Sequence, residues 1–170
     1  MKELVGNLMA VRHGILVHGC NAQGVMGSGV AAAVRETYPG AYEAYRRAYE
    51  KRMRETGKTL ELGRVVWFTV SKDEPKLAVA NAITQEFYGR DPNRVYVSYD
   101  AIRTAFHRIG EVAREHQLPV HYPLIGAGLA NGDWTTIADI IDQELEGVEH
   151  TVWTLPGFPK PPSRSKPKLG

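Results

Sequence analysis

The chain has 170 residues, of which 43% are hydrophobic and 24% are charged. This length is enough for one domain with a buried core and too short for two ordinary domains, and the composition excludes a collagen-like, coiled-coil or wholly disordered chain. No apolar run reaches the roughly 18 residues of a membrane span, and Met1-Lys2-Glu3 leads into no signal-like core. We therefore expect a cytoplasmic protein without membrane association, and we expect a monomer.

The net charge of +2 hides a difference between the body of the chain and its last part. Segment 156–170 carries four basic residues, no acidic residue and five of the ten prolines, which leaves 17 basic against 19 acidic residues before it. Such a segment cannot bury enough apolar surface to offset its ordering entropy, so we expect a folded domain over 1–155 and a disordered tail over 156–170. The basic isoelectric point belongs to the tail and does not indicate a nucleic-acid-binding face on the domain.

The first half of the chain predicts one buried strand followed by two helices. The apolar run 15–20 enters glycines and predicts a strand that ends near Asn21. Apolar residues then recur at helical spacing from Ser28, with Ser28 or the preceding glycine as the cap, and Pro39-Gly40 ends this helix. A second helix is expected over about 41–55. One stripe of this helix is expected to pack in the core and consists of Tyr42, Tyr45, Tyr49 and Met53.

The second half of the chain alternates strands and helices. Apolar, β-branched runs predict the strands, and apolar residues at helical spacing predict the helices. The expected strands cover 63–70, 77–83, 120–125 and 150–155, and the expected helices cover 97–116 and 134–145. This alternation predicts a layered α/β domain with a largely parallel central sheet, in which ligand loops lie at the carboxyl ends of the strands.

Two glycine-rich segments each connect a predicted strand to a predicted helix. The first is Asn21-Ala22-Gln23-Gly24-Val25-Met26-Gly27-Ser28-Gly29-Val30, and the second is Pro123-Leu124-Ile125-Gly126-Ala127-Gly128-Leu129-Ala130. Each segment alone could be no more than a tight turn. Two of them on one sheet edge indicate a ligand with a diphosphate, because glycines free backbone N–H groups for an anion at a helix N-terminus. The glycine spacing differs from the dinucleotide-binding pattern, which disfavours a nicotinamide-dependent dehydrogenase.

From these segments the chain resembles the macrodomain family of ADP-ribose-binding modules over roughly residues 4–155. The family's opening element resembles Gly6-Asn7-Leu8. Its first ligand loop resembles His18-Gly19-Cys20-Asn21 and the glycines after it. Its diphosphate loop resembles Ile125-Gly126-Ala127-Gly128-Leu129 with Asp133-Trp134. This form of the diphosphate loop resembles that of the branch with the terminal ADP-ribose glycohydrolase and DNA-ADP-ribose-removing antitoxins. The resemblance implies a three-layer α/β/α fold with a mixed, largely parallel sheet.

The resemblance also implies where ADP-ribose would bind. Asn7 would take the adenine amino group, the first loop would wrap the distal ribose, and the second loop would hold the diphosphate. The implied ligand-binding residues are Asn7, Leu8, Asn21, Gly24, Val25, Met26, Gly27, Ser28, Gly29, Val30, Gln85, Phe87, Ile125, Gly126, Ala127, Gly128, Leu129 and Ala130.

Three of these residues also have simpler interpretations. Asn7 can be a turn asparagine, and Asn21 can form an Asx turn instead of holding a ribose hydroxyl or a water. Phe87, with the neighbouring Tyr88, can cover a ribose or base by stacking, and core packing of Phe87 is equally compatible with the sequence.

The chain departs from the resembling branch at catalytic positions. Gln85 stands where lysine-using members carry a nucleophile, so a covalent Schiff-base route is in doubt because glutamine has no nucleophilic amine. Ala130 stands where human-type members carry an aspartate. His18 and Asp133 are the remaining candidates for acid or base work, with Asn21 as a third catalytic candidate, although His18 can also be a core histidine. A histidine before the first-loop asparagine resembles the fungal macrodomain phosphatases that act on ADP-ribose-1''-phosphate.

Cofactor-free chemistry is expected. The five other histidines are scattered without metal-ligand spacing, so no metal site is predicted; they are His13, His107, His116, His121 and His150. The single cysteine, Cys20, can form no internal disulfide or cysteine zinc site, and its strand context predicts burial.

Three functions remain in this order. The first is a hydrolase that releases a group from the distal ribose, with ADP-ribose-1''-phosphate preferred over ADP-ribosylated macromolecules. The second is a non-catalytic ADP-ribose reader. The third is a nucleic-acid adaptor that uses the basic tail, for which four charges could supply only part of the affinity.

Overall fold

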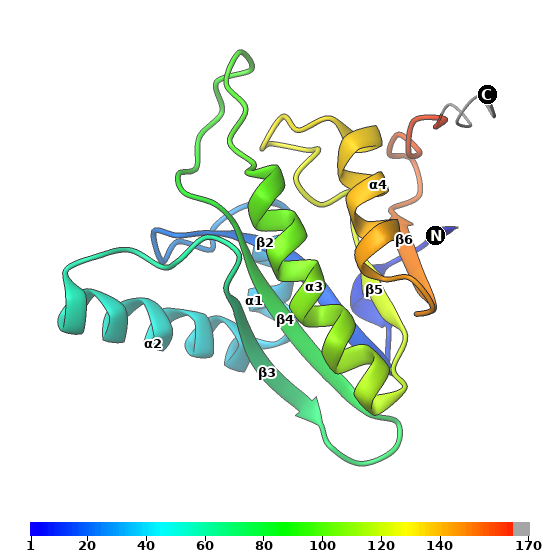
Figure 1. The fold of residues 1–170 in the computed structure, drawn as a ribbon, viewed down its shortest axis with the longest axis horizontal. Helices are drawn as coiled ribbons and strands as arrows, with labels where there is room; N and C mark the ends of the chain where they lie inside the picture. The colour runs from blue at the N-terminus through cyan, green and yellow to red at the C-terminus, as the bar shows by residue number, and fades with distance from the viewer. Residues whose placement is uncertain (165–170) are drawn as a thin grey trace.

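The computed structural model describes residues 1–164 and contains one mixed sheet between two layers of helices (Figure 1). The strand order across the sheet is β1-β6-β5-β2-β4-β3. Every neighbouring pair is parallel except β3 and β4, which are antiparallel. The largely parallel, mixed sheet is therefore confirmed. The strands are β1 (Lys2–Val5), β2 (Gly14–Asn21), β3 (Val65–Ser71), β4 (Leu77–Gln85), β5 (Val120–Tyr122) and β6 (His150–Thr154).

Helices cover both faces of the sheet, which confirms the three-layer α/β/α arrangement. They are α1 (Gly29–Thr37), α2 (Pro39–Thr56), α3 (Tyr99–His116), α4 (Trp134–Glu144) and a short 3-10 helix, η1 (Leu8–Ala10). Alternate residues of β2 separate the two layers: Ile15 and Val17 pack with α3 and α4, whereas Leu16 and Cys20 pack with α1 and α2. This is the two-residue period of a strand that is buried on both faces.

Most expected elements are present, with a few differences. Strand β1 was not expected, because its four residues are all exposed and carry no apolar run. Helix α2 begins at Pro39, which occupies a first-turn position, so Pro39-Gly40 starts the second helix as well as ending the first. In the predicted tyrosine stripe, Tyr45 is fully buried but Met53 is 38% exposed, so only part of the stripe is core.

No helix among residues 1–164 is long and apolar enough to cross a membrane. The last described residue, Arg164, forms ion pairs with Asp139 and Asp142 of α4. Segment 156–164 therefore makes at least one defined contact with the domain. Residues 165–170 lie outside the described part of the chain, and the disordered tail stays a prediction.

Candidate ligand site

The carboxyl ends of β1, β6, β5, β2 and β4 meet at one edge of the sheet, because these five strands are parallel. The loops after them hold all the predicted ligand segments. Backbone hydrogen bonds connect neighbouring loops: Ala22 N donates to Gln85 O at 2.9 Å, and Gly6 N donates to Thr154 O at 2.8 Å. The structure thus brings Asn7, both glycine loops and Gln85 to the same edge.

Asn21 organises the first glycine loop. Its Oδ1 accepts hydrogen bonds from Gln23 N at 2.9 Å and from the Tyr45 hydroxyl at 3.0 Å, while its Nδ2 donates to Val25 O at 2.7 Å. The Asx-turn interpretation of Asn21 is therefore what the structure contains. Its polar atoms hold the loop in a fixed shape at the end of β2.

Tyr45 is a residue of this site that the sequence interpretation missed. Its ring is fully buried, and its hydroxyl donates to Asn21 O at 2.7 Å as well as to Asn21 Oδ1. Helix α2 also supplies Arg46, whose Nη1 donates to Gly24 O at 3.1 Å. The tyrosine stripe indicated core packing, and no sequence signal linked its hydroxyl to a loop 24 residues earlier.

The rest of the first loop presents backbone to solvent. Gly24 adopts φ +78° with its Cα against the Tyr49 ring, and Met26 is buried beneath the loop. Beyond them the loop is exposed, and a Cβ added at Gly27 or Gly29 would meet no atom within 4 Å. The exposed residues of this loop are Val25, Gly27, Ser28, Gly29 and Val30.

Helix α1 begins directly after this exposed backbone. Its N-cap residue, Ser28, makes no side-chain capping hydrogen bond. The first-turn N–H groups of a helix lack intrahelical partners, so an anion at this end can accept hydrogen bonds from them.

The second glycine loop is held by backbone turns. Gly126 adopts φ +75°, and a Cβ there would lie 2.7 Å from Val97 Cγ2. Gly132 N donates to Gly126 O at 2.8 Å, and Tyr96 N donates to Ala130 O at 2.9 Å. Ile125 and Ala130 are buried, Ala127 is half-buried, and Leu129 is exposed. Only Gly128 has open space over its Cα, so this position is where a ligand can approach the backbone most closely.

Asn7 and Leu8 follow β1 at the far end of the edge. Asn7 is exposed and caps η1, with its Oδ1 accepting from Met9 N at 2.9 Å, so the turn-asparagine interpretation also describes the structure. A carbonyl oxygen has two lone pairs, so Asn7 Oδ1 can accept a second hydrogen bond from a ligand amine. Leu8 is buried and supports the turn from below.

Gln85 is the last residue of β4 and Phe87 lies two residues later, at the other end of the edge. Gln85 Nε2 donates to Phe87 O at 2.8 Å. The Phe87 side chain is 50% exposed, so the core-packing interpretation of Phe87 is wrong and its ring is available for contact.

His18 does not reach this edge. It is fully buried on the α2 side of the sheet, and its Nε2 donates to Asn81 Oδ1 at 2.6 Å. Burial lowers the pKa of His18 to about 4, although the hydrogen bond that the ring donates to Asn81 opposes this shift, so the ring is neutral near neutral pH. The geometry corrects the expectation that His18 acts directly on a ligand, because strand alternation turns the side chain into the core.

Asp133 is exposed and is the N-cap residue of α4. Its Oδ2 accepts from Thr136 Oγ1 at 2.6 Å and from Thr136 N at 2.9 Å, and these hydrogen bonds lower its pKa. A carboxyl group held in this way is ionised at neutral pH and has no proton to donate. The structure does not bring Asp133 together with His18, and its catalytic role stays a prediction.

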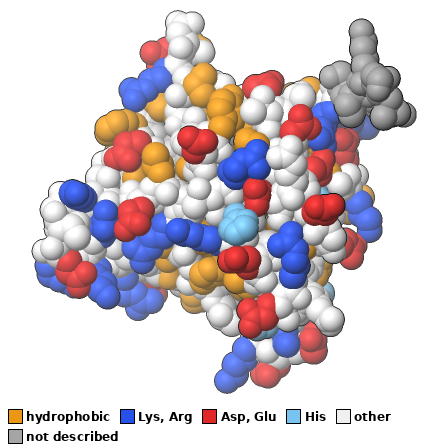
Figure 2. All heavy atoms as spheres, in the orientation of Figure 1, with side chains coloured by type: hydrophobic (Ala, Val, Ile, Leu, Met, Phe, Trp, Pro, Cys, Tyr) orange, Lys and Arg blue, Asp and Glu red, His pale blue; other side chains and the backbone are white. Residues whose placement is uncertain are grey.

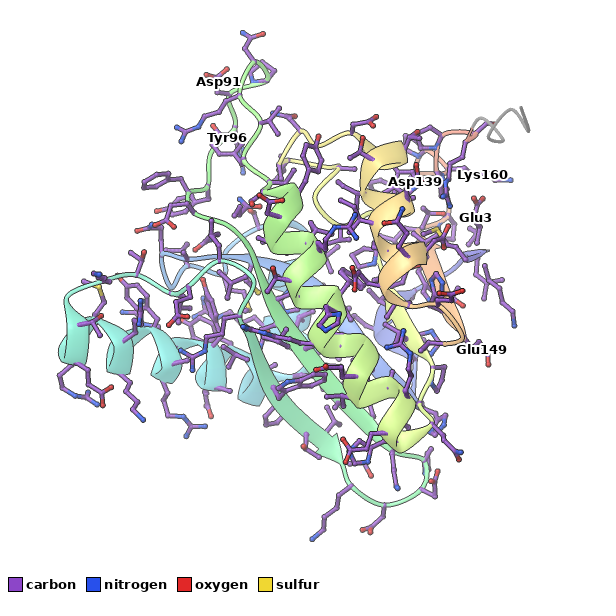
Figure 3. The ribbon with its side chains drawn as sticks, in the orientation of Figure 1. Glu3, Asp91, Tyr96, Asp139, Glu149 and Lys160 are labelled. Atoms are coloured by element: carbon purple, nitrogen blue, oxygen red, sulfur yellow. The ribbon has the colours of Figure 1, made fainter. Side chains whose placement is uncertain are left out.

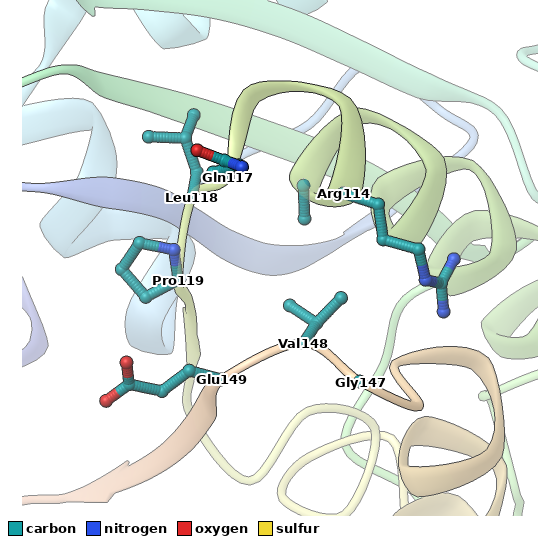
Figure 4. Close-up of a pocket in the computed structure, with 8 residues that line it drawn as sticks. Arg114, Gln117, Leu118, Pro119, Gly147, Val148 and Glu149 are labelled. Carbon is teal, nitrogen blue, oxygen red and sulfur yellow. The ribbon is translucent and has the colours of Figure 1, made fainter.

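Two hollows lie away from the loops. One, of about 340 Å³, is lined by Arg114, Leu118, Val148 and Glu149, at the C-terminal end of α3 and beside the starts of β5 and β6 (Figure 4). The other, of about 400 Å³, lies over α3 beside Arg103, His107 and Glu144. Among residues 1–164, no group of three or more His, Cys, Asp or Glu side chains could hold a metal ion.

The single sheet between two helical layers, with two glycine loops at the carboxyl ends of its parallel strands, defines a three-layer α/β/α module. The sequence model described as Macro domain matches residues 17–141. The chain belongs to the Macro domain family.

The curated relatives of this chain include a glycohydrolase and a phosphatase. The DNA ADP-ribosyl glycohydrolase of Thermus aquaticus is 26% identical over 96% of this chain and 45% of its own length, so the chain spans less than half of that protein. The ADP-ribose 1''-phosphate phosphatase of Candida albicans is 21% identical over 83% of this chain and 87% of its own length. Among solved structures, a macrodomain protein from Streptomyces coelicolor is 30% identical, with a TM-score of 0.71 over 90% of this chain and 97% of that chain.

Proposed function

We propose that the protein binds ADP-ribose along the carboxyl edge of its sheet and hydrolyses a group attached to the distal ribose, with ADP-ribose-1''-phosphate as the preferred substrate. The observation that carries the proposal is the pair of glycine loops on one edge, each with a glycine over which there is open space. The names of the Thermus aquaticus and Candida albicans relatives are those of hydrolases of ADP-ribose compounds, which supports a hydrolase here.

The strand order suggests how the ligand would lie. Asn7 follows β1, the second loop follows β5, and Asn21 and Gln85 are the last residues of β2 and β4. An adenine at Asn7, a diphosphate over Gly128 and a distal ribose beside the first loop would therefore run along the edge in this order. The group to be removed would lie nearest to Gln85.

The chemistry in this proposal uses water. Gln85 offers no amine for a covalent intermediate, and His18 is enclosed in the core. A water molecule oriented by Asn21 and the glycine-loop amides, with the substrate phosphates assisting proton transfer, would break the bond between the phosphate and the distal ribose. The products are ADP-ribose and inorganic phosphate.

A non-catalytic reader is the second candidate. It is favoured by Gln85 and Ala130, which lack the catalytic groups of the resembling enzymes at these positions. The contacts of Asp133 are those of a helix cap, which also favours a reader. In this case the partner would be an ADP-ribosylated macromolecule whose ADP-ribose end the edge holds without cleavage.

A hydrolysis panel beside calorimetric titration tests both candidates. The panel contains ADP-ribose-1''-phosphate, ADP-ribosylated protein, ADP-ribosylated DNA and O-acetyl-ADP-ribose, and ADP-ribose is the titrant. We expect ADP-ribose to bind and the 1''-phosphate to turn over fastest. Binding without turnover of any compound would favour the reader, and absence of ADP-ribose binding would overturn the whole proposal.

A matched pair of variants locates the site. Gly128→Val adds a β-branched side chain where open space lies over the backbone, so it should weaken ADP-ribose binding at least about tenfold by blocking close approach. Gly128→Ala adds the smallest side chain at the same point and should weaken binding less. Equal affinity of the parent and the valine variant would place the ligand elsewhere.

A further inference from the structure

Trp153 connects three neighbouring strands near the Asn7 end of the ligand edge. It belongs to β6, which lies between β1 and β5, and it is half-buried on the side of the sheet that carries α1 and η1. The opposite side is covered by α3 and α4, whose outer surface carries the many charged side chains seen in Figure 2. The proposed function makes no use of Trp153.

One end of the indole is held by His121 of β5. Trp153 Nε1 donates to His121 Nδ1 at 3.1 Å, and His121 Nε2 donates to His13 O at 3.1 Å. An indole N–H can only donate and a carbonyl oxygen can only accept, so the two contacts fix Nδ1 as the acceptor and Nε2 as the donor. His121 therefore holds Trp153 as a neutral imidazole.

The other end of the indole lies against Gly6, the residue before Asn7. A Cβ added at Gly6 would lie 2.9 Å from Trp153 Cζ3 and 3.3 Å from Trp153 Cε3, so the Gly6 backbone rests directly on the ring. Gly6 is otherwise tied to β6 by its N–H, which donates to Thr154 O at 2.8 Å. The position of the indole therefore determines where the Gly6-Asn7 segment lies.

Asn7 presents its amide in one orientation. Its Oδ1 accepts from Met9 N at 2.9 Å, and a flipped amide would place Nδ2 against that N–H group and lose the hydrogen bond. An amide oxygen held in this way can accept from the amine of adenine, whereas it is repelled by the carbonyl that hypoxanthine carries at the same position. This discrimination requires a fixed Gly6-Asn7 segment.

We propose that Trp153, held by His121, is a positioning residue that fixes the Gly6-Asn7 segment and thereby gives the site its preference for adenine over bases without the amine. The inference rests on the proposed binding of ADP-ribose and adds the means by which the base is selected. Trp153 acts through Asn7, and His121 acts through Trp153. Residues that hold a binding group in place in this way determine how sharply the group discriminates.

The arrangement makes base preference sensitive to acid. A protonated imidazole carries hydrogen on both nitrogens and cannot accept from Trp153. Burial lowers the pKa of His121, while its hydrogen bond to His13 O and the charge of Glu149 oppose this shift. The charged groups around it are paired: Glu149 Oε1 lies 2.9 Å from Lys2 Nζ, and His13 Nδ1 lies 3.8 Å from Glu74 Oε2. The preference should be complete at neutral pH and decline in acid.

The experiment compares, by calorimetric titration of the whole chain, ADP-ribose with its hypoxanthine analogue. The parent should bind ADP-ribose about tenfold more tightly, the effect of one hydrogen bond. Trp153→Phe removes Nε1 and shortens the ring, so it should reduce this preference to about twofold or less without changing affinity for the analogue. Trp67→Phe is the matched control, because Trp67 is also half-buried but belongs to β3 at the far edge of the sheet, and it should change neither affinity.

Two variants of His121 separate the hydrogen bond from packing. His121→Leu removes the acceptor and should abolish the preference, whereas His121→Asn keeps an acceptor oxygen near the position of Nδ1 and should retain it. Because asparagine does not titrate, the second variant should also keep the preference when the pH is lowered from 7.5 to 5, while the preference of the parent declines. The Trp153 indole N–H resonance, assigned by its absence in Trp153→Phe, reports the hydrogen bond without any ligand and should move upfield in His121→Leu.

A double-mutant cycle with Asn7 tests the route of the effect. Asn7→Ala should remove the preference, and adding Trp153→Phe should then have no further effect on it. Equal affinity losses for both ligands in Trp153→Phe, or an unchanged preference, would overturn the inference. A parent that binds both ligands equally would overturn it too and would leave the proposed binding of ADP-ribose intact. A parent that binds neither ligand would overturn the proposed function and the inference together.

Discussion

The two sides of the sheet support the two glycine loops by different means. On the α3 and α4 side, a continuous apolar cluster that includes Phe106, Ile137 and Ile141 fills the space beneath the second loop. On the α2 side, buried polar groups take part: His18 donates to Asn81, Asn81 Nδ2 donates to Ala41 O at 3.1 Å, and the Tyr45 hydroxyl donates to Asn21. Both loops contain backbone turns, but only the first loop is also held by a hydrogen bond from a buried side chain of α2, whereas apolar packing lies beneath the second.

This difference indicates how each loop can be disturbed. The second loop keeps its shape through glycine conformation and backbone turns, so an added Cβ is the change to which it is most sensitive. The first loop depends on donors from another element, so loss of a single hydroxyl or a change of protonation can alter it. Buried hydrogen-bonded groups cost more when one partner is lost than apolar contacts of the same size.

The largest effect is expected from Gly126→Val. The residue has φ +75°, which is strained for any side chain, and its Cβ would overlap Val97 and Ile137. Left-handed strain and overpacking together should lower the free energy of unfolding by about 3 kcal/mol, measured by urea denaturation. Gly128→Val, two residues later in open space, should change it by no more than about 0.5 kcal/mol. Similar stability of the two variants would remove the proposed rigidity of this loop.

Acid should destabilise the protein next most strongly. An unfolded chain protonates His18 near the ordinary pKa of 6.5, whereas the buried ring protonates only near pH 4. The stability from this group is complete above pH 6.5 and is lost as the pH falls toward 4, by an amount of about 3 kcal/mol. His150, whose pKa burial also lowers to about 4, adds a loss of the same sign.

His18→Gln isolates the contribution of the α2 side. This variant should be less stable than the parent at pH 7.5, and its stability should fall less between pH 6.5 and 4.5. Urea denaturation at these pH values provides the measurement. A parallel loss in parent and variant would mean that His18 titrates normally and that the polar side is more open than the structure indicates.

The sequence predicted the fold well where burial is uniform and less well where direction matters. Periodicity predicted a helix over 97–116, and α3 begins two residues later and ends at the predicted residue. The prediction was accurate because the apolar face of this helix is continuous. The apolar run 15–20 located β2. It could not show which side His18 faces, since both faces of that strand are buried. Strand β1 carries no burial pattern and is defined by its pairing with β6, which is remote in sequence.

The site was predictable in part for the same reason. Glycines and strand ends locate Gly126, Gly128 and Asn21, because backbone freedom and polarity are local properties of the sequence. The hydroxyl of Tyr45 reaches Asn21 only after α2 has packed on the sheet, so that contact depends on tertiary structure.

Tyr45→Phe should have a moderate effect on the first loop. It removes a donor to Asn21 O and Oδ1 while keeping the ring, so we expect a loss of about 1–2 kcal/mol in stability and about tenfold in ADP-ribose affinity by calorimetry. Tyr122→Phe is the matched control, since Tyr122 is also fully buried and its hydroxyl pairs with His150 Nδ1 at 2.6 Å on the other side of the sheet. Its stability cost should be similar and its ADP-ribose affinity unchanged. Equal affinity losses in both variants would show a general softening instead of a specific support for Asn21.

The smallest effect is expected where the tail meets the apolar side. Arg164 pairs with Asp139 and Asp142 on α4, and these carboxylates are 56% and 32% exposed, so solvent weakens the attraction. Arg164→Gln should therefore cost at most about 1 kcal/mol, a fall in Tm of at most about 4 °C, with no change in ADP-ribose affinity. Lys160→Gln is the control, because Lys160 is basic, exposed and without an ion pair among residues 1–164 (Figure 3). A larger fall in Tm for Arg164→Gln than for Tyr45→Phe would mean that the stability of α4 depends on the segment after β6. Apolar packing alone would then not stabilise the α3 and α4 side of the sheet.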